Sequence, residues 1–179
     1  MRQTAGIATA IDHAAIERLA EALHEVYRHQ GRVFVVGLGG SLANAEHMAA
    51  DLRKLCEIEA QAPNPAEMSA WINDVSRDHV FDGALRWMRA DDVLLVLSVG
   101  GGASDVSAGI TRAVAEFKSV SQKVFGIVGP IGGYTAEHAD IVIKVPAIDR
   151  ITPHTEAFQA VIWHCLVSHP LLQKHKTKW

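Results

Sequence analysis

The stretch Val33-Phe34-Val35-Val36-Gly37-Leu38-Gly39-Gly40-Ser41 decides the fold. Its first four residues form an unbroken apolar run, which is typical of a strand that helices cover on both faces. The glycines and the serine that follow predict a tight turn into a helix over residues 42–55. Such a helix begins with free N–H groups and the positive end of its dipole, which predict an anion-binding site near Ser41.

Further apolar runs predict the rest of a repeating pattern of strands and helices. We expect strands at 92–98, 123–129 and 141–145, with a short extended piece at 58–61. We expect helices at 11–30, 104–117 and 154–172, and helical segments around a polar kink within 66–89. This alternation predicts an α/β fold, a three-layer αβα sandwich with a parallel sheet. The glycine-rich loops after Val36 and Leu97 should then share the sheet edge at which such folds bind ligands.

Composition limits the class of protein. The 179 residues predict one domain over 1–179, and the net charge of −3 without a Lys/Arg cluster argues against nucleic acid as a partner. No apolar stretch approaches the roughly 20 residues that cross a bilayer, and the N-terminus lacks the apolar core of a signal peptide. Cys56 and Cys165 have no CxxC spacing, which indicates reduced thiols in a cytoplasmic protein that has no membrane partner.

The first glycine loop matches neither common nucleotide-binding motif. Leu42 occupies the position of the third glycine in the dinucleotide fingerprint, and no Gly-Lys-Ser/Thr follows as in a Walker A loop. A plain tight turn remains an alternative. Two such loops, each with a serine (Ser41 and Ser98), favour a site for a phosphoester.

Two pairs of polar side chains are candidates for chemistry. His47 and Asp51 are four residues apart, so they share one helix face as an acid/base pair, a metal pair or a surface ion pair. Glu156 and His164 are eight residues apart in an otherwise apolar helix, about 12 Å along its axis. A shared metal would require both side chains to lean inward, or two chains to meet. The alternative is a Glu that the helix dipole stabilises, and an unrelated His.

These motifs together resemble the sugar isomerase (SIS) domain family, and within it the phosphoheptose isomerases, over nearly the whole chain. The resemblance rests on Gly39-Gly40-Ser41 with His47 and Asp51, the Asn73-Asp74 kink, the loop from Ser98 to Gly102, and Glu156 with His164. It implies a flavodoxin-like sheet and a homotetramer with active sites at subunit contacts, with the N-terminal helix (about 10–30) in the interface. It also implies conversion of sedoheptulose 7-phosphate to D-glycero-D-manno-heptose 7-phosphate through an enediolate.

The resemblance also implies roles for individual residues. Zinc is expected on His47, Asp51, Glu156 and His164, with Asp51 or Glu156 as the proton-transferring carboxylate and His164 as its acid/base partner. The expected substrate-binding residues are Gly39, Gly40, Ser41, Asn73, Asp74, Ser98, Gly100, Gly101, Gly102 and Ser104.

The chain departs from the family pattern at several of these positions. Asp51 stands where the family has Glu, and Glu156 where it has Gln. The family's phosphate loop, Ser-Thr-Ser-Gly-Asn-Ser, retains only Ser98 and Gly101, so hydroxyl donors are lost while backbone donors remain. Two other functions stay open: a non-catalytic family member that binds the replication initiator, and a regulator that senses a sugar phosphate.

Overall fold

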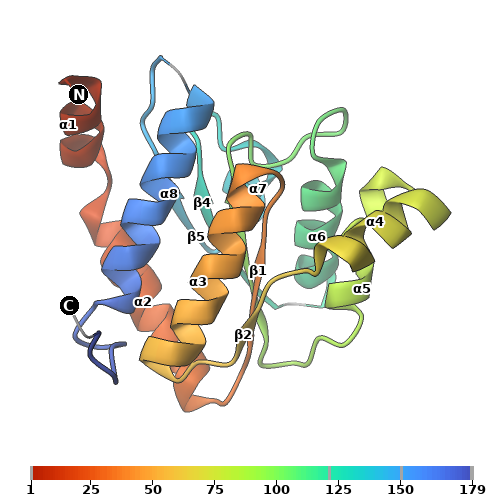
Figure 1. Cartoon of the computed structure of the whole chain (residues 1–179), viewed down its shortest axis with the longest axis horizontal. Helices are drawn as coiled ribbons and strands as arrows, with labels where there is room; N and C mark the ends of the chain where they lie inside the picture. The colour runs from red at the N-terminus through yellow and green to blue at the C-terminus, as the bar shows by residue number, and fades with distance from the viewer. Residues whose placement is uncertain (1, 121, 150, 178–179) are drawn as a thin grey trace.

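A five-stranded parallel sheet forms the centre of the computed structural model, which describes residues 2–120, 122–149 and 151–177 (Figure 1). The strands are β1 (Val33–Val36), β2 (Ala60–Gln61), β3 (Val93–Ser98), β4 (Lys123–Val128) and β5 (Ile141–Lys144). Their order is β2-β1-β3-β4-β5, with every pair parallel. The predicted three-layer α/β sandwich with a flavodoxin-like sheet is therefore confirmed.

Helices cover both faces of the sheet. They are α1 (Arg2–Ala10), α2 (His13–Arg28), α3 (Gly40–Cys56), α4 (Pro65–Asp74), the 3₁₀ turn η1 (Arg77–His79), α5 (Asp82–Leu85), α6 (Ala108–Ser119), α7 (Gly133–His138) and α8 (Ile151–Val167). Successive side chains of a strand point to opposite faces. Val33 and Val35 accordingly pack in the core with α2, α3 and α8, whereas Phe34 and Val36 pack in the core with α4, α5 and α6.

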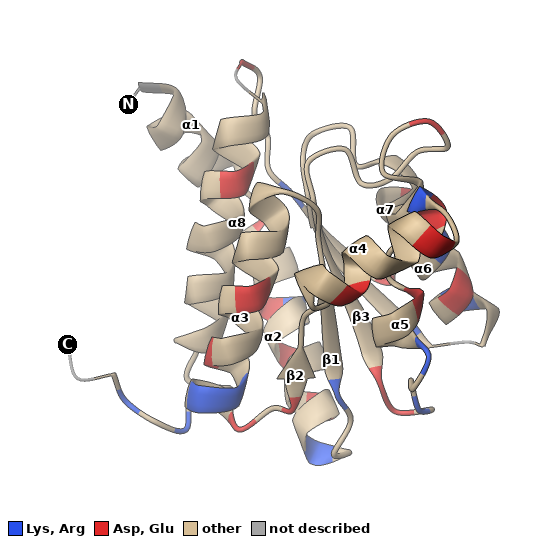
Figure 2. Ribbon diagram, turned by 45° about the vertical axis from the view of Figure 1, so that its right-hand side comes forward, with Lys and Arg blue, Asp and Glu red and all other residues tan. Residues whose placement is uncertain are grey.

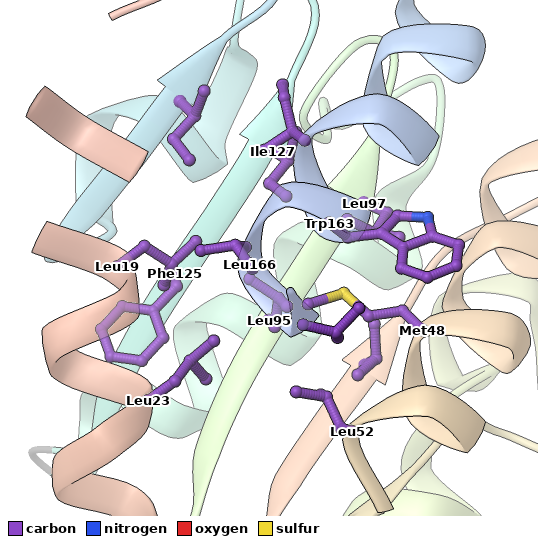
Figure 3. Close-up of a cluster of buried hydrophobic side chains, with 14 of the residues drawn as sticks. Leu19, Leu23, Met48, Leu52, Leu95, Leu97, Phe125, Ile127, Trp163 and Leu166 are labelled. Atoms are coloured by element: carbon purple, nitrogen blue, oxygen red, sulfur yellow. The ribbon is translucent and has the colours of Figure 1, made fainter. Parts of the chain in front are cut away.

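The larger of the two cores holds α2, α3 and α8 against the sheet. Figure 3 shows side chains of these three helices meeting those of β3 and β4: Leu19, Leu23, Met48, Leu52, Leu95, Leu97, Phe125, Ile127, Trp163 and Leu166. The apolar stripe of α2 is thus buried against its own sheet. Because three helices share this core, the position of α8 relative to α3 is fixed by packing.

The boundaries of several helices differ from the prediction. Residues 2–28 form two helices, because Asp12 caps α2 by accepting a hydrogen bond from the Ala15 N–H at 3.1 Å. The short α1, which buries Ile7, was not predicted, and neither was α7. Helix α6 begins at Ala108, four residues later than expected, because the chain first makes a turn. The last helix runs over Ile151–Val167 rather than 154–172.

The described residues show no basic cluster and no disulfide, as the sequence led us to expect. Figure 2 shows Lys and Arg scattered over several elements rather than gathered on one. Within the described ranges, no helix combines the length and apolarity needed to span a bilayer. Both cysteines are free, as predicted, and burial raises the pKa of the Cys56 thiol to about 11.

Candidate active site

Both glycine-rich loops lie at the carboxyl edge of the sheet. Val36 pairs with Val96 in the parallel register, so the loops that follow β1 and β3 are neighbours, as expected. A cavity of about 680 Å³ lies at the opposite edge, among the first residues of β3, β4 and β5. Open α/β sheets bind their ligands beyond the carboxyl ends of the strands, so we place the candidate site at the loop edge and on the adjoining helices.

Helices α3 and α8 run side by side in the same direction and bring three chemical side chains together (Figure 1). His47, Asp51 and His164 each offer one metal-binding atom, and these atoms lie within 4.8 Å of one another. The His47 Nε2 is 3.7 Å from the Asp51 Oδ2. The His47 side chain is 60% exposed and that of Asp51 is 16% exposed, so the group lies on the outer face of the helix pair.

The bonding of His164 leaves one ring nitrogen available. Its Nδ1 lies 2.7 Å from the Ala160 carbonyl oxygen, which can only accept, so Nδ1 carries a proton, and in the neutral imidazole Nε2 then keeps a free electron pair. Such a backbone contact is typical of a metal-binding histidine, because it fixes both the tautomer and the ring direction. Two imidazoles and a carboxylate with an open fourth position match a catalytic zinc centre. The three side chains therefore fit the metal that the sequence predicts.

Trp163 forms the floor of this group. Its indole is fully buried, stacks on His164 with ring centroids 3.5 Å apart, and meets the His47 ring edge-on at 4.7 Å. The two imidazoles lie 5.5 Å apart and nearly perpendicular. A rigid buried ring thus limits the rotation of both histidines.

Glu156 lies apart from the other expected ligands. Its carboxylate lies over Gly40, so close that a Cβ built on Gly40 would be 2.5 Å from Oε2. Gly40 is the first residue of α3, seven residues before His47, or about 10 Å along the helix axis. Among the described residues, the group of possible metal ligands on α3 and α8 does not include Glu156. Glu156 thus lies at the loop edge, and Asp51 lies with the histidines.

A buried amide joins the beginning of α3 to α8. Gln159 is fully buried, and its Oε1 accepts from the Ser41 hydroxyl at 3.0 Å and from the Asn44 Nδ2 at 3.2 Å. Its Nε2 donates to the Ile127 carbonyl at 3.4 Å. The Ser41 side chain, expected to bind substrate, is thus buried and holds two helices together, which leaves its backbone N–H for a ligand.

The second glycine loop is held by its own contacts. The Ser98 hydroxyl accepts from the Gly101 N–H at 3.0 Å, and the Gly101 carbonyl accepts from the Thr135 hydroxyl at 2.7 Å. Gly101 and Gly102 are buried with φ of 75° and 91°, so both need glycine, whereas Gly100 is exposed. Of the expected loop residues, Gly100 and Ser104 are the exposed ones.

A pocket of about 230 Å³ opens between the two loops. Its lining includes Leu38, Ile72, Arg77, Ser104, Ser107 and Gly109, together with the carboxylates of Asp78 and Asp105. Arg77, which no sequence motif indicated, brings a cation to the beginning of α6. Asn73 and Asp74 lie in the last turn of α4 beside this pocket, and the Asn73 amide donates to the Asp74 carboxylate at 2.7 Å.

A second polar cluster holds the Arg77 segment against α6. Arg112 pairs with both oxygens of Asp82 at 2.9 and 3.0 Å, and the His79 Nδ1 lies 2.6 Å from the same carboxylate. Burial raises the pKa of Asp82, but the contacts with Arg112 and His79 outweigh it and leave that pKa lowered. Sequence spacing gave little sign of this cluster, since Asp82 and Arg112 are 30 residues apart.

Comparison with known proteins identifies the class. The SIS domain model matches residues 2–129. The phosphoheptose isomerase of Mycobacterium tuberculosis (strain ATCC 25177 / H37Ra) is 32% identical over 163 residues, which are 87% of this chain and 80% of that protein. The structure of the phosphoheptose isomerase from Neisseria gonorrhoeae superposes with a TM-score of 0.81 at 26% identity, covering 93% of this chain and 89% of that one.

The chain therefore belongs to the SIS domain family. Its relatives also include the phosphoheptose isomerase of Rhodospirillum rubrum, which is 31% identical over 85% of this chain and 82% of that protein. The resemblance that the sequence motifs indicated is confirmed.

Proposed function

We propose that this protein is an aldose–ketose isomerase that converts sedoheptulose 7-phosphate to D-glycero-D-manno-heptose 7-phosphate. The observation that carries the proposal is the meeting of His47, Asp51 and His164 on α3 and α8, in a chain whose relatives bear the name phosphoheptose isomerase. Isomerisation needs a base for the proton beside the carbonyl and an electrophile for the carbonyl oxygen. The three side chains supply both kinds of group.

Zinc is the proposed cofactor, with His47, Asp51 and His164 as its ligands. When bound, it would polarise the substrate carbonyl and stabilise the negative charge of the enediolate. His164 has one free nitrogen, because Nδ1 is held by the Ala160 carbonyl. It can therefore ligate the metal or move the oxygen proton, but one atom cannot do both at once. We assign it to the metal, because one of its ring nitrogens lies within 4.8 Å of ligand atoms of both His47 and Asp51.

Asp51 is the proposed base. A carboxylate has two oxygens, so one can face His47 and the metal while the other takes the proton from the carbon beside the carbonyl and returns it to the former carbonyl carbon. The proton of the adjacent hydroxyl passes to the former carbonyl oxygen within the enediolate, which completes the exchange of carbonyl and hydroxyl. Glu156, the other carboxylate expected from the sequence, lies about 10 Å further along the helix pair. That distance separates it from a carbonyl held at the histidines. The phosphate would lie at the loop edge, near Arg77, Ser104 and the free amides of the loops.

The protein is proposed to act as a homotetramer. His47 and His164 are exposed, and Val161, between Glu156 and His164 on α8, is 50% exposed. A reaction through an enediolate requires the exclusion of water, which a second copy over this face would provide. Light scattering should give four chains per particle. A monomer that turns over the substrate would overturn this part of the proposal.

An isomerase assay tests the function. The wild type should convert sedoheptulose 7-phosphate, and a chelator should abolish the activity until zinc is restored. His164→Ala should lose both bound metal and turnover, whereas Glu46→Gln, which removes an exposed carboxylate of α3 outside the ligand group, should keep both. Absence of turnover by the metal-loaded wild type on any phosphorylated sugar would refute the proposal. In that case the non-catalytic functions, a replication-initiator partner or a sugar-phosphate regulator, become the alternatives.

A further inference from the structure

The beginning of α3 is the part of the loop edge best suited to bind an anion, and the carboxylate of Glu156 lies there. Gly39 occupies the N-cap position with φ of 61° and has no side chain that could cap the first turn. The N–H groups of Leu42 and Ala43 bond to the Gly39 carbonyl, which leaves those of Gly40 and Ser41 without an intrahelical partner and able to attract negative charge. The Glu156 carboxylate lies directly over Gly40, with all three of its carboxyl atoms within 2.7 Å of where a Cβ would be.

The backbone that carries Glu156 is firmly held. The Asn44 Nδ2 donates to the Glu156 carbonyl at 2.9 Å, and the same amide nitrogen reaches the buried Gln159 at 3.2 Å. Ser41, the second residue of α3, bonds the same Gln159 oxygen. These contacts join the first turns of α3 to the segment of α8 that bears Glu156. The network therefore fixes the backbone from which the Glu156 side chain extends over Gly40.

We infer that Glu156 is a specificity-determining residue: its charge excludes phosphate from the beginning of α3 and reserves that place for the uncharged hydroxyls of the sugar chain, between its carbonyl and its phosphate. This inference rests on the proposed function, because it concerns how a phosphorylated sugar is oriented in the same site. A carboxylate accepts hydrogen bonds from sugar hydroxyls but repels a second anion at contact distance. The phosphate is then left to the second loop, where Arg77 offsets part of the charge of Asp78 and Asp105 in the pocket lining and backbone amides remain as donors.

The charge of Glu156, rather than its size, carries this effect. Glu156→Gln keeps the shape over Gly40 and removes the charge, so phosphate gains access to the free amides of α3. Glu156→Asp keeps the charge and shortens the side chain. We expect inorganic phosphate to bind Glu156→Gln at least about tenfold more tightly than the wild type, and Glu156→Asp to resemble the wild type.

The experiment is a calorimetric titration of the three metal-free proteins with inorganic phosphate, combined with amide NMR of the Glu156→Gln protein. The amides of Gly40 and Ser41 should shift on phosphate addition in Glu156→Gln and stay unchanged in the wild type. Equal phosphate affinities of wild type and Glu156→Gln would overturn the inference. Tighter phosphate binding with amide shifts confined to residues 104–109 would also overturn the inference, because the added affinity would then arise at the loop after β3.

The outcome is separable from that of the proposed function. The titration needs no turnover, so an inactive wild type with a phosphate gain in Glu156→Gln would refute the isomerase and leave the role of Glu156 standing. An active wild type, together with no increase of phosphate affinity in Glu156→Gln, would support the isomerase and refute the role of Glu156. Circular dichroism of all three proteins controls for loss of fold.

Discussion

Trp163 and His164 are consecutive residues of α8, yet their rings stack with centroids 3.5 Å apart and planes inclined by 30°. The indole is fully buried while the imidazole is exposed. The stack therefore connects the hydrophobic core directly to the candidate metal group, and the same indole also touches His47 at its edge. The orientation of both histidines thus depends on a core residue that bears no ligand atom.

Replacing this indole should weaken metal binding. Trp163→Phe retains an aromatic side chain but removes much of the surface on which His164 rests, so we expect zinc to bind about tenfold more weakly. Calorimetric zinc titration measures the change. Trp87→Phe is the matched control, because Trp87 is 71% exposed and lies outside the site. Unchanged zinc affinity in a folded Trp163→Phe protein would show that the stack does not position the ligand.

Substitutions of the two carboxylates, Asp51 and Glu156, should have different effects on the kinetics. Asp51→Asn is expected to lower kcat by about 10²- to 10⁴-fold, because it removes the proposed base. Glu156→Gln should change KM more than kcat, since Glu156 lies at the loop edge rather than beside the histidines. Steady-state kinetics on sedoheptulose 7-phosphate decides between them. A larger loss of kcat in Glu156→Gln than in Asp51→Asn would move the base to Glu156.

The buried amide of Gln159 should contribute measurably to stability. Gln159→Leu leaves the buried Ser41 hydroxyl without its acceptor, which we expect to lower the free energy of unfolding by about 1–3 kcal/mol. Urea unfolding measures the loss. Ser41→Ala in the Gln159→Leu background should cost little more, because the unpaired hydroxyl is then gone. Additive losses in the double variant would contradict a shared network.

Acid should destabilise the segment that carries Arg77. The pKa of Asp82 is lowered in the folded chain, so Asp82 contributes stability above its unfolded pKa of about 3.9, and that contribution is lost as the pH falls through the folded pKa. The wild type should therefore lose stability between about pH 5 and pH 2 more steeply than Asp82→Asn. Urea unfolding across this range tests it, with Asp78→Asn as the neighbouring control. Parallel profiles for all three proteins would rule out the ion pair as the cause.

Much of the site could be predicted from local sequence, and the exceptions share a cause. The His47–Asp51 pair follows from helical spacing alone, and its meeting with His164 was expected from the resemblance. Arg77, Trp163 and Gln159 were missed because their roles arise from contacts between distant segments. An amide within the apolar face of the last helix was the available signal for Gln159, since a buried polar side chain requires partners.

The sequence by itself determined the alternating strands and helices, because side-chain periodicity and glycine turns act over a few residues. It also determined that two glycine loops share one sheet edge. Only the tertiary structure decided what fills that edge, because the position of α8 along α3 depends on core packing and on the buried Gln159 contacts. That packing places the Glu156 carboxylate over Gly40. The anion-binding site that the sequence predicts at the beginning of α3 is therefore occupied by a carboxylate of the chain itself.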